Sequence, residues 1–150
     1  MSKGTMLILG ARSDMAMAIA HRFAKEGYDI QLAARTADSL AADASDIELR
    51  YQVAVTQYEF DALDTASHEA FVEHLPVLPD IAVCAVGYMG EQAKNERDTQ
   101  AASLVMRSNY EGPASIVAVI ANHFEERGTG CLIGISSVAG ERGRATNYVY

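Results

Sequence analysis

Two hydroxyl side chains near the end of the sequence have the chemistry needed to reduce a carbonyl group. A tyrosine acts as a general acid when neighbouring positive charge lowers its pKa from the ordinary value of about 10. A serine hydroxyl can hold the carbonyl oxygen in line with that proton. Ser137 and Tyr150, thirteen positions apart, are the candidates. Taken by themselves, two serines followed by a segment rich in glycine and arginine are more typical of an ordinary loop than of an active site.

A glycine turn near the N-terminus indicates a site for an anion. The apolar run at residues 6–9 is typical of a strand buried on both faces, and it ends at Gly10. Ser13 and Asp14 are favoured helix N-cap residues. The residues that follow repeat apolar side chains at helical spacing, namely Met15, Ile19, Ala20 and Phe23. A strand, a tight turn and a helix in this order point the helix N-terminus at an anion.

A dinucleotide pyrophosphate is the usual anion at such a turn. The predicted cofactor contacts are Gly10, Arg12, Ser13, Asp14 and Met15. The generic fingerprint G-x-G-x-x-G does not occur here, and many strand–helix turns carry one glycine for packing alone. By itself, the turn therefore leaves phosphate binding and simple packing as alternatives of equal weight.

Arg35 directly follows the second predicted strand, where nucleotide-binding sheets meet the adenosine ribose. An acidic residue there would accept hydrogen bonds from the ribose 2′-hydroxyl and indicate NAD, whereas an arginine pairs with a 2′-phosphate. The strand ends in Ala34 instead of an aspartate, and Arg12 can supply a second positive charge. We therefore predict NADP(H) rather than NAD(H). Two solvated surface arginines remain the alternative.

Strands alternate with helices along the whole chain. The predicted strands are residues 6–9, 28–34, 51–60, 81–86 and 131–135, although residues 46–60 are ambiguous between helix and strand. The predicted helices start at Asp14, at Thr36 as a cap and at Thr65, and the last covers residues 101–126 with a break or bend at Gly112-Pro113. Residues 88–98 are predicted to form a loop that leads into a helix.

This alternation predicts an α/β fold, a Rossmann-like, doubly wound parallel sheet with helices on both faces, in one domain over residues 1–150. In such sheets ligands bind outside the carboxyl ends of the strands. The residues at those ends are Gly10, Ala34, Arg35, Asp61, Gly87, Ser136 and Ser137. The predicted site therefore collects residues from distant parts of the sequence at one edge of the sheet.

Composition excludes several classes of partner. The chain has 150 residues, of which 49% are hydrophobic and 21% are charged, and its formal net charge is −8. The negative charge argues against nucleic acid or an anionic membrane surface as the main partner. No apolar run approaches the ~18 residues of a membrane span. The N-terminus shows no signal-peptide pattern, so we expect a cytoplasmic protein.

The cysteines and histidines give no metal or disulfide signal. Cys84 and Cys131 each lie inside an apolar run, which predicts two buried, reduced thiols rather than a disulfide or a metal pair. The four histidines fall within predicted helices without ligand spacing. We therefore expect solvated or packing roles for them and no metal site.

Together, these features resemble the N-terminal part of a short-chain dehydrogenase/reductase, and the match covers all 150 residues. That family combines a Gly-rich turn after the first strand with an Asp after the third and an Asn-rich end of the fourth. It also has an Asn on a helix and a Ser followed thirteen positions later by Tyr-x-x-x-Lys. Here Ser137 and Tyr150 keep that spacing, Asn109 lies in SNYEGP, and Asp61 lies in FDALD.

The resemblance implies an NADP(H)-dependent oxidoreductase (EC 1.1.1.-) that transfers hydride between the nicotinamide and a small carbonyl or alcohol substrate. Tyr150 would donate the proton, Ser137 would orient the carbonyl oxygen, and Asn109 would hold a water that links to the family's lysine. That lysine binds the nicotinamide ribose and lowers the tyrosine's pKa by its charge. The implied cofactor contacts extend to Arg35, Asp61, Ala85, Val86 and Gly87.

Three departures from the family pattern stand out. The turn reads GARSDMA, so Asp14 and Ala16 replace two of the family's glycines, and the fourth strand ends in CAVG, which keeps only Gly87. The third is that the sequence stops at Tyr150, before the lysine and the last strands. We therefore expect that these 150 residues alone are not a competent catalyst.

Alternatives to this interpretation remain. One is a nucleotide-binding or regulatory module without turnover, and another is a relative of the sugar-nucleotide epimerases. Tyr148, eleven positions after Ser137, competes with Tyr150 for the catalytic role. A homo-oligomer is possible through the helix at residues 101–126, whose apolar members are Leu104, Val105, Ile116, Val119 and Ile120. The substrate is not predicted.

Overall fold

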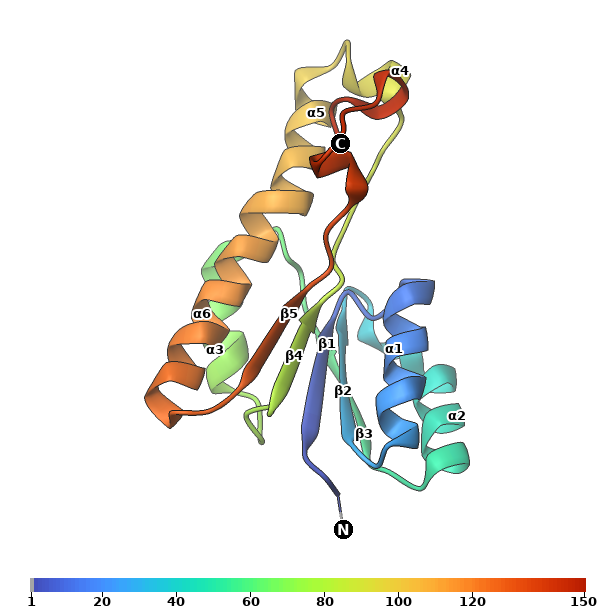
Figure 1. The fold of residues 1–150 in the computed structure, drawn as a ribbon, viewed down its shortest axis with the longest axis vertical. Coiled ribbons are helices and arrows are strands. Elements are labelled where there is room, and N and C mark those ends of the chain that lie inside the picture. The colour runs from blue at the N-terminus through green and yellow to red at the C-terminus, as the bar shows by residue number, and fades with distance from the viewer. Residues whose placement is uncertain (1) are drawn as a thin grey trace.

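Five parallel strands form a single sheet in the order β3-β2-β1-β4-β5 (Figure 1). The structure is a computed structural model that describes residues 2–150. The strands are β1 (Thr5–Leu9), β2 (Asp29–Ala34), β3 (Val55–Glu59), β4 (Ile81–Cys84) and β5 (Cys131–Gly134). The order reverses between β1 and β4, so the predicted Rossmann-like parallel sheet is confirmed.

Helices cover the sheet on both faces. On one face lie α1 (Asp14–Lys25) and α2 (Ala41–Tyr51), and on the other lie α3 (His68–Glu73) and α6 (Gly112–Arg127) (Figure 1). The short helix α4 (Gln92–Asn95) and helix α5 (Thr99–Met106) lie beyond the carboxyl edge of the strands. This edge is therefore overhung by α4, α5 and the segment that follows β5.

The central strand β1 is buried because it has neighbours on every side. It pairs with β2 and with β4, and the side chains of residues 6–9 have no exposed surface. Met6 and Ile8 belong to the apolar cluster under α1 and α2, whereas Leu7 and Leu9 belong to the cluster under α3 and α6. The continuous apolar run at residues 6–9 therefore contributes alternate side chains to the two apolar clusters on opposite faces of the sheet.

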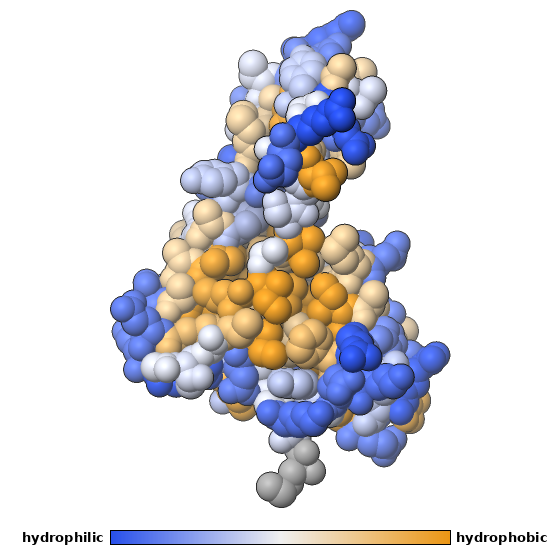
Figure 2. Space-filling view, viewed as in Figure 1, coloured by the Kyte–Doolittle hydropathy of each residue, from blue (hydrophilic) through white to orange (hydrophobic). Residues whose placement is uncertain are grey.

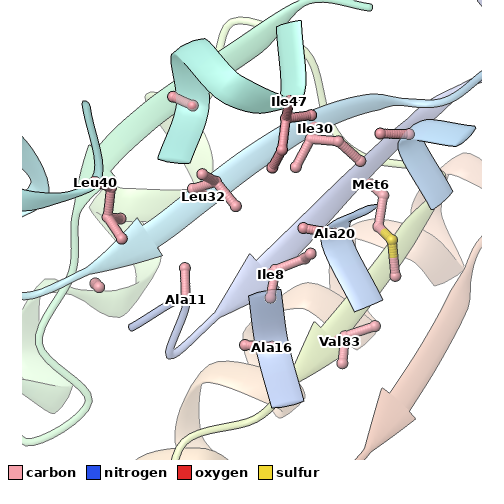
Figure 3. Packing of buried hydrophobic residues seen from close by; sticks show 13 residues of the cluster. Met6, Ile8, Ala11, Ala16, Ala20, Ile30, Leu32, Leu40, Ile47 and Val83 are labelled. Carbon is pink, nitrogen blue, oxygen red and sulfur yellow. The ribbon is translucent and has the colours of Figure 1, made fainter. Parts of the chain in front are cut away.

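Helix α1 approaches the sheet through small side chains. Ala16, Ala20 and Ala24 recur every four residues and are buried, and the methyl groups of Ala16 and Ala20 lie over Ile8 (Figure 3). Side chains at this spacing share one helix face, and alanine lets the helix backbone lie close to the strand. The prediction that Met15 belongs to the apolar stripe was wrong, since its side chain is 55% exposed.

A π-helical turn, Arg107–Glu111, joins α5 to α6 into one long helix. The N–H of Gly112 donates to the carbonyl of Arg107, five residues back. Pro113 has no N–H, so it cannot donate to the carbonyl four residues before it, and the wide turn accommodates that loss. The predicted irregularity at Gly112-Pro113 is therefore real, but the helix widens upstream of it and continues.

Two other expectations need correction. Helix α2 ends at Tyr51 and β3 begins at Val55, so the predicted strand at residues 51–60 starts four residues too early. Thr36 does not cap a helix: its φ is +58° and its side chain makes no capping hydrogen bond to the 3₁₀ turn Ala37–Leu40. The donors of that turn are satisfied from another strand, as described below.

Strand β5 lies at the edge of the sheet and its side chains are largely exposed. α6 packs against β5 on one face, and on the other face only Ile133 of β5 packs against the apolar cluster under α1 and α2. Leu132 and Ile135 are exposed, and Figure 2 shows an apolar area where Figure 1 draws β4 and β5.

Cys84 is buried and Cys131 is exposed, both as free thiols, so the predicted burial of Cys131 was wrong.

The helix at residues 101–126, predicted as an oligomer interface, packs most of its apolar side chains into the core of the chain. Val105, Ile116 and Ile120 are fully buried within the chain, which removes them from any surface. Among residues 2–150, no helix combines the length and the hydropathy that crossing a membrane would need.

We expect Gly112→Ala to destabilise the full-length protein by about 1–3 kcal/mol, the usual cost of overpacking a tight contact. A Cβ at Gly112 would collide with the backbone of Ala62, which cannot move without shifting the loop after β3. The free energy of unfolding from urea titration measures the effect. Gly143→Ala is the matched control because its Cβ would enter open space, and equal stabilities of the two variants would contradict the packing argument.

Candidate nucleotide-binding cleft

A cleft of about 610 Å³ opens at the carboxyl edge of β1 to β4. Its lining comes from every loop that leaves these strands, and consists of Gly10, Arg12, Ser13, Ala34, Arg35, Phe60, Asp61, Ala62, Leu63, Ala85, Val86, Gly87, Tyr88, Leu104 and Ser108. All of the predicted cofactor residues line it except Asp14 and Met15, which form the adjoining first turn of α1. The sequence-based set therefore converges on one cavity.

Gly10 lies at the crevice where the strand order reverses. Its φ is +83°, a conformation that favours glycine, and its N–H donates to Ala33 O at 2.9 Å. A Cβ on Gly10 would lie 2.9 Å from Val86 N and 3.0 Å from the carbonyl of Ala85. The ends of β1 and β4 thus touch backbone to backbone, which only a residue without a side chain permits.

The first turn of α1 presents unused N–H donors beside the cleft. Ser13 caps the helix, because its Oγ accepts a hydrogen bond from Ala16 N at 3.1 Å. Within residues 2–150, no hydrogen bond engages the N–H groups of Asp14 and Met15. With the positive end of the helix dipole, these donors and the glycine turn fit a pyrophosphate.

Glu59, at the end of β3, holds the turn that carries Arg35. Its Oε1 accepts from Thr36 N and its Oε2 from Ala37 N, both at 2.8 Å. The hydrogen bonds from Ala37 and Thr36 lower the pKa of Glu59 below its ordinary value. Glu59 is not among the residues predicted from the sequence, because its role depends on the parallel pairing that sets it opposite Ala34.

The loop after β3 forms one wall of the cleft through residues 60–63. Asp61 organises the loop, since its Oδ1 accepts from Leu63 N at 2.9 Å.

The thiol of Cys84 lies at the end of β4 and is buried. Burial raises its pKa, and a hydrogen bond from the backbone of Val86 lowers that pKa in part. A protonated, buried thiol is not a nucleophile at neutral pH.

Asn109 lies in the π-helical turn and clamps the chain that leaves β4. Its Oδ1 accepts from Tyr88 N at 2.9 Å, and its Nδ2 donates to Tyr88 O at 2.6 Å and to Val105 O at 2.8 Å. π-turns recur at functional sites because they re-aim one side chain. Here that side chain fixes the position of Gly87 and Tyr88 in the cleft wall.

Ser137 and Tyr150 belong to the segment that follows β5, which extends from the carboxyl edge of the sheet toward α4 (Figure 1). Ser137 caps a short 3₁₀ turn, with its Oγ accepting from Ala139 N at 3.2 Å. Tyr150 is 37% exposed, and its neighbour Val149 donates to Gln92 Oε1 of α4 at 3.3 Å. Across residues 2–150, the lining of the cleft includes neither of them nor Asn109, and no hydrogen bond joins Ser137 to Tyr150.

Over residues 2–150, no group of three or more His, Cys, Asp or Glu side chains is arranged to hold a metal ion. The cleft instead offers backbone donors, two arginines and one aspartate. The cleft lies at the carboxyl edge where the strand order reverses, which is the place where doubly wound sheets bind their ligands.

Comparison with known proteins places the chain in a family. The family model described as short chain dehydrogenase matches residues 4–150, and the chain belongs to this family, the short-chain dehydrogenases/reductases. An oxidoreductase of Mycobacterium tuberculosis is 38% identical over 150 residues, which is 97% of this chain and 59% of the relative. The chain therefore spans about three-fifths of the length of the curated relatives that it matches.

Solved structures agree with this assignment. A short-chain dehydrogenase from Sphingobium yanoikuyae in complex with NADPH superposes with a TM-score of 0.85 at 26% identity, over 97% of this chain and 58% of that one. An actinorhodin polyketide ketoreductase with NADPH gives 0.87 at 26% identity, over 100% and 60%. An NAD⁺-bound xylitol dehydrogenase superposes with a TM-score of 0.86 over 99% of this chain and 58% of that one. At 18% identity this similarity shows the fold alone.

We expect the stabilising effect of Glu59 to vanish in acid. A pKa lowered by folding means that the unfolded chain takes up the proton first, so the contribution is complete above about pH 4.5. The stabilising contribution of Glu59 is lost as the pH falls through the lower pKa that its carboxyl group has in the folded protein. The urea midpoint of the full-length protein should therefore exceed that of Glu59→Gln at neutral pH, and the difference should shrink below the ordinary Glu pKa of 4.5.

The control for this experiment is Glu125→Gln, a change at an exposed position on α6. The two midpoint differences are compared across about pH 3 to 7. A Glu59→Gln difference that stays constant over this range would contradict the assigned hydrogen bonds.

Proposed function

We propose that the protein is an NADP(H)-dependent oxidoreductase that interconverts a small carbonyl compound and the corresponding alcohol. The observation that carries the proposal is the cleft at the reversal of strand order, where the Gly10 turn and the free donors of α1 adjoin Arg35 and Asp61. A cytoplasmic location and a small-molecule substrate belong to the same proposal.

The cofactor's adenosine half is assigned to the side of the cleft made by β1, β2 and β3. There the Gly10 turn and the N–H groups of Asp14 and Met15 bind the pyrophosphate. Arg35, with Arg12, pairs with the 2′-phosphate, and Asp61 contacts the adenine. Ala85, Val86 and Gly87, at the end of β4, line the path toward the nicotinamide half.

When bound, the nicotinamide cofactor supplies or accepts the hydride. Tyr150 gives a proton to the carbonyl oxygen in reduction and takes it back in oxidation, while Ser137 orients that oxygen by a hydrogen bond. Asn109 holds the backbone at Tyr88, and we assign to it a water that links to the family's lysine. The family's lysine position follows Tyr150, so the catalytic experiments require the full-length protein.

If Arg35 recognises the 2′-phosphate, Arg35→Ala should weaken NADPH binding by about 10- to 100-fold, the loss expected for hydrogen bonds to a charged group. NADH binding should change by less than about threefold, because NADH has no 2′-phosphate. Fluorescence titration of the full-length protein with each reduced cofactor measures both constants. Arg50→Ala is the control, since Arg50 is paired with Asp46 on α2 outside the cleft. Equal losses for both cofactors would contradict the assignment.

If Tyr150 is the proton donor, Tyr150→Phe should lower turnover by about 100-fold or more and leave the NADPH dissociation constant unchanged. Tyr148→Phe is the matched control two residues away and should retain turnover. The assay follows NADPH oxidation with a carbonyl compound that the wild-type protein reduces, chosen from a panel. Loss of turnover in Tyr148→Phe alone would transfer the role to Tyr148, and NADPH binding with no turnover on any carbonyl would favour a non-catalytic module.

A further inference from the structure

A fully buried histidine, His68, underlies the wall of the cleft. It begins α3 and has no exposed surface. Its Nδ1 lies 2.9 Å from Ser115 Oγ of α6, and its Nε2 lies 3.3 Å from the main-chain oxygen of Asp61. Its ring stacks on Phe60, with centroids 5.4 Å apart and an interplanar angle of 30°.

The hydrogen-bond partners determine the tautomer of His68. A main-chain carbonyl can only accept, so Nε2 carries the proton and donates to Asp61 O. The unprotonated Nδ1 then accepts from the Ser115 hydroxyl. A neutral ring thus satisfies both nitrogens without placing a charge in the core.

The loop above His68 has little freedom. Asp61 is bonded to His68 through its carbonyl and to Leu63 N through its carboxylate. Gly112 places the start of α6 directly against the backbone of Ala62, where a Cβ would collide. The same loop supplies residues 60–63 to the wall of the cleft. His68 therefore contacts, from the side of the core, the segment that carries the Asp61 carboxylate.

We propose that His68 is a positioning residue for the adenine end of the cofactor, acting through the Asp61 main chain. This inference rests on the proposed function, which assigns the adenine to Asp61. A carboxylate recognises adenine through its exocyclic amino group, the base's hydrogen-bond donor, and such recognition depends on a fixed position of the acceptor. This positioning role requires the hydrogen bond from His68 to Asp61 O, and filling the same volume of the core would not be sufficient.

The test compares two substitutions in the full-length protein. The amide nitrogen of His68→Gln can reach the position of Nε2 and keep the bond to Asp61 O, whereas the shorter His68→Asn reaches only toward Ser115. Each variant is titrated by fluorescence with NADPH and with its hypoxanthine analogue, which lacks the amino group. We expect His68→Asn to weaken NADPH binding by about 3- to 10-fold, the size of one hydrogen bond.

The same variant should bind the hypoxanthine analogue within about twofold of the wild-type protein, because that base offers no amino group for Asp61 to accept from. His68→Gln should restore NADPH binding to within about twofold. Equal weakening for both cofactors, or no rescue by Gln, would overturn the positioning role and leave His68 as a packing residue.

Ser115→Ala covers the case in which His68→Asn does not fold. This variant frees the ring on its Nδ1 side, and it should weaken NADPH binding by about threefold while the analogue is unaffected. An equal response to both cofactors would again overturn the inference. Wild-type protein that binds neither cofactor would instead refute the proposed function, so the two failures are distinguishable.

Discussion

The contact between Gly10 and the backbone after β4 is the constraint on which the rest of the site depends. Parallel strands β1 and β4 are neighbours in the sheet, yet the chain follows a different course after each of them. After β1 it turns into α1 on one face, and after β4 it continues beyond the edge of the sheet toward α4. The crevice between them stays narrow at its base because Gly10 has no Cβ to meet Val86. That narrowness lets a helix N-terminus and the loops after β2 and β3 face the same cavity.

Polar side chains, in addition to apolar packing, hold the loops around this cavity. Glu59 binds the turn after β2, Asn109 binds the chain after β4, and His68 binds the loop after β3, each through main-chain atoms. Phe60 and Ala62 anchor the loop after β3 in the apolar cluster, and directed hydrogen bonds fix the main chain of the loops further. Among residues 2–150, no group accepts a hydrogen bond from the N–H groups of Asp14 and Met15 at the start of α1.

The sequence predicts much of this arrangement because the governing signals are local. Apolar runs place the strands, Ser13 marks the cap of α1, and the residues directly after the strands line the cleft. The missed features depend on distant partners: Glu59 acts through strand pairing, and His68 through an element 47 residues away. The exposure of Met15 and Cys131 follows from which neighbours cover them, which local pattern does not encode. The roles of Ser137, Tyr150 and Asn109 stay predictions.

The most direct test of the central claim is a titration of the full-length wild-type protein with NADPH, monitored by nicotinamide fluorescence. We expect saturable binding of one NADPH per chain, displaced competitively by adenosine 2′,5′-bisphosphate, since the proposed function assigns the adenosine half and its 2′-phosphate to the part of the cleft beside Gly10 and Arg35. We also expect weaker displacement by AMP, which lacks the 2′-phosphate. Absence of saturable NADPH binding, or binding that adenosine 2′,5′-bisphosphate does not displace, would contradict the assignment of the cleft.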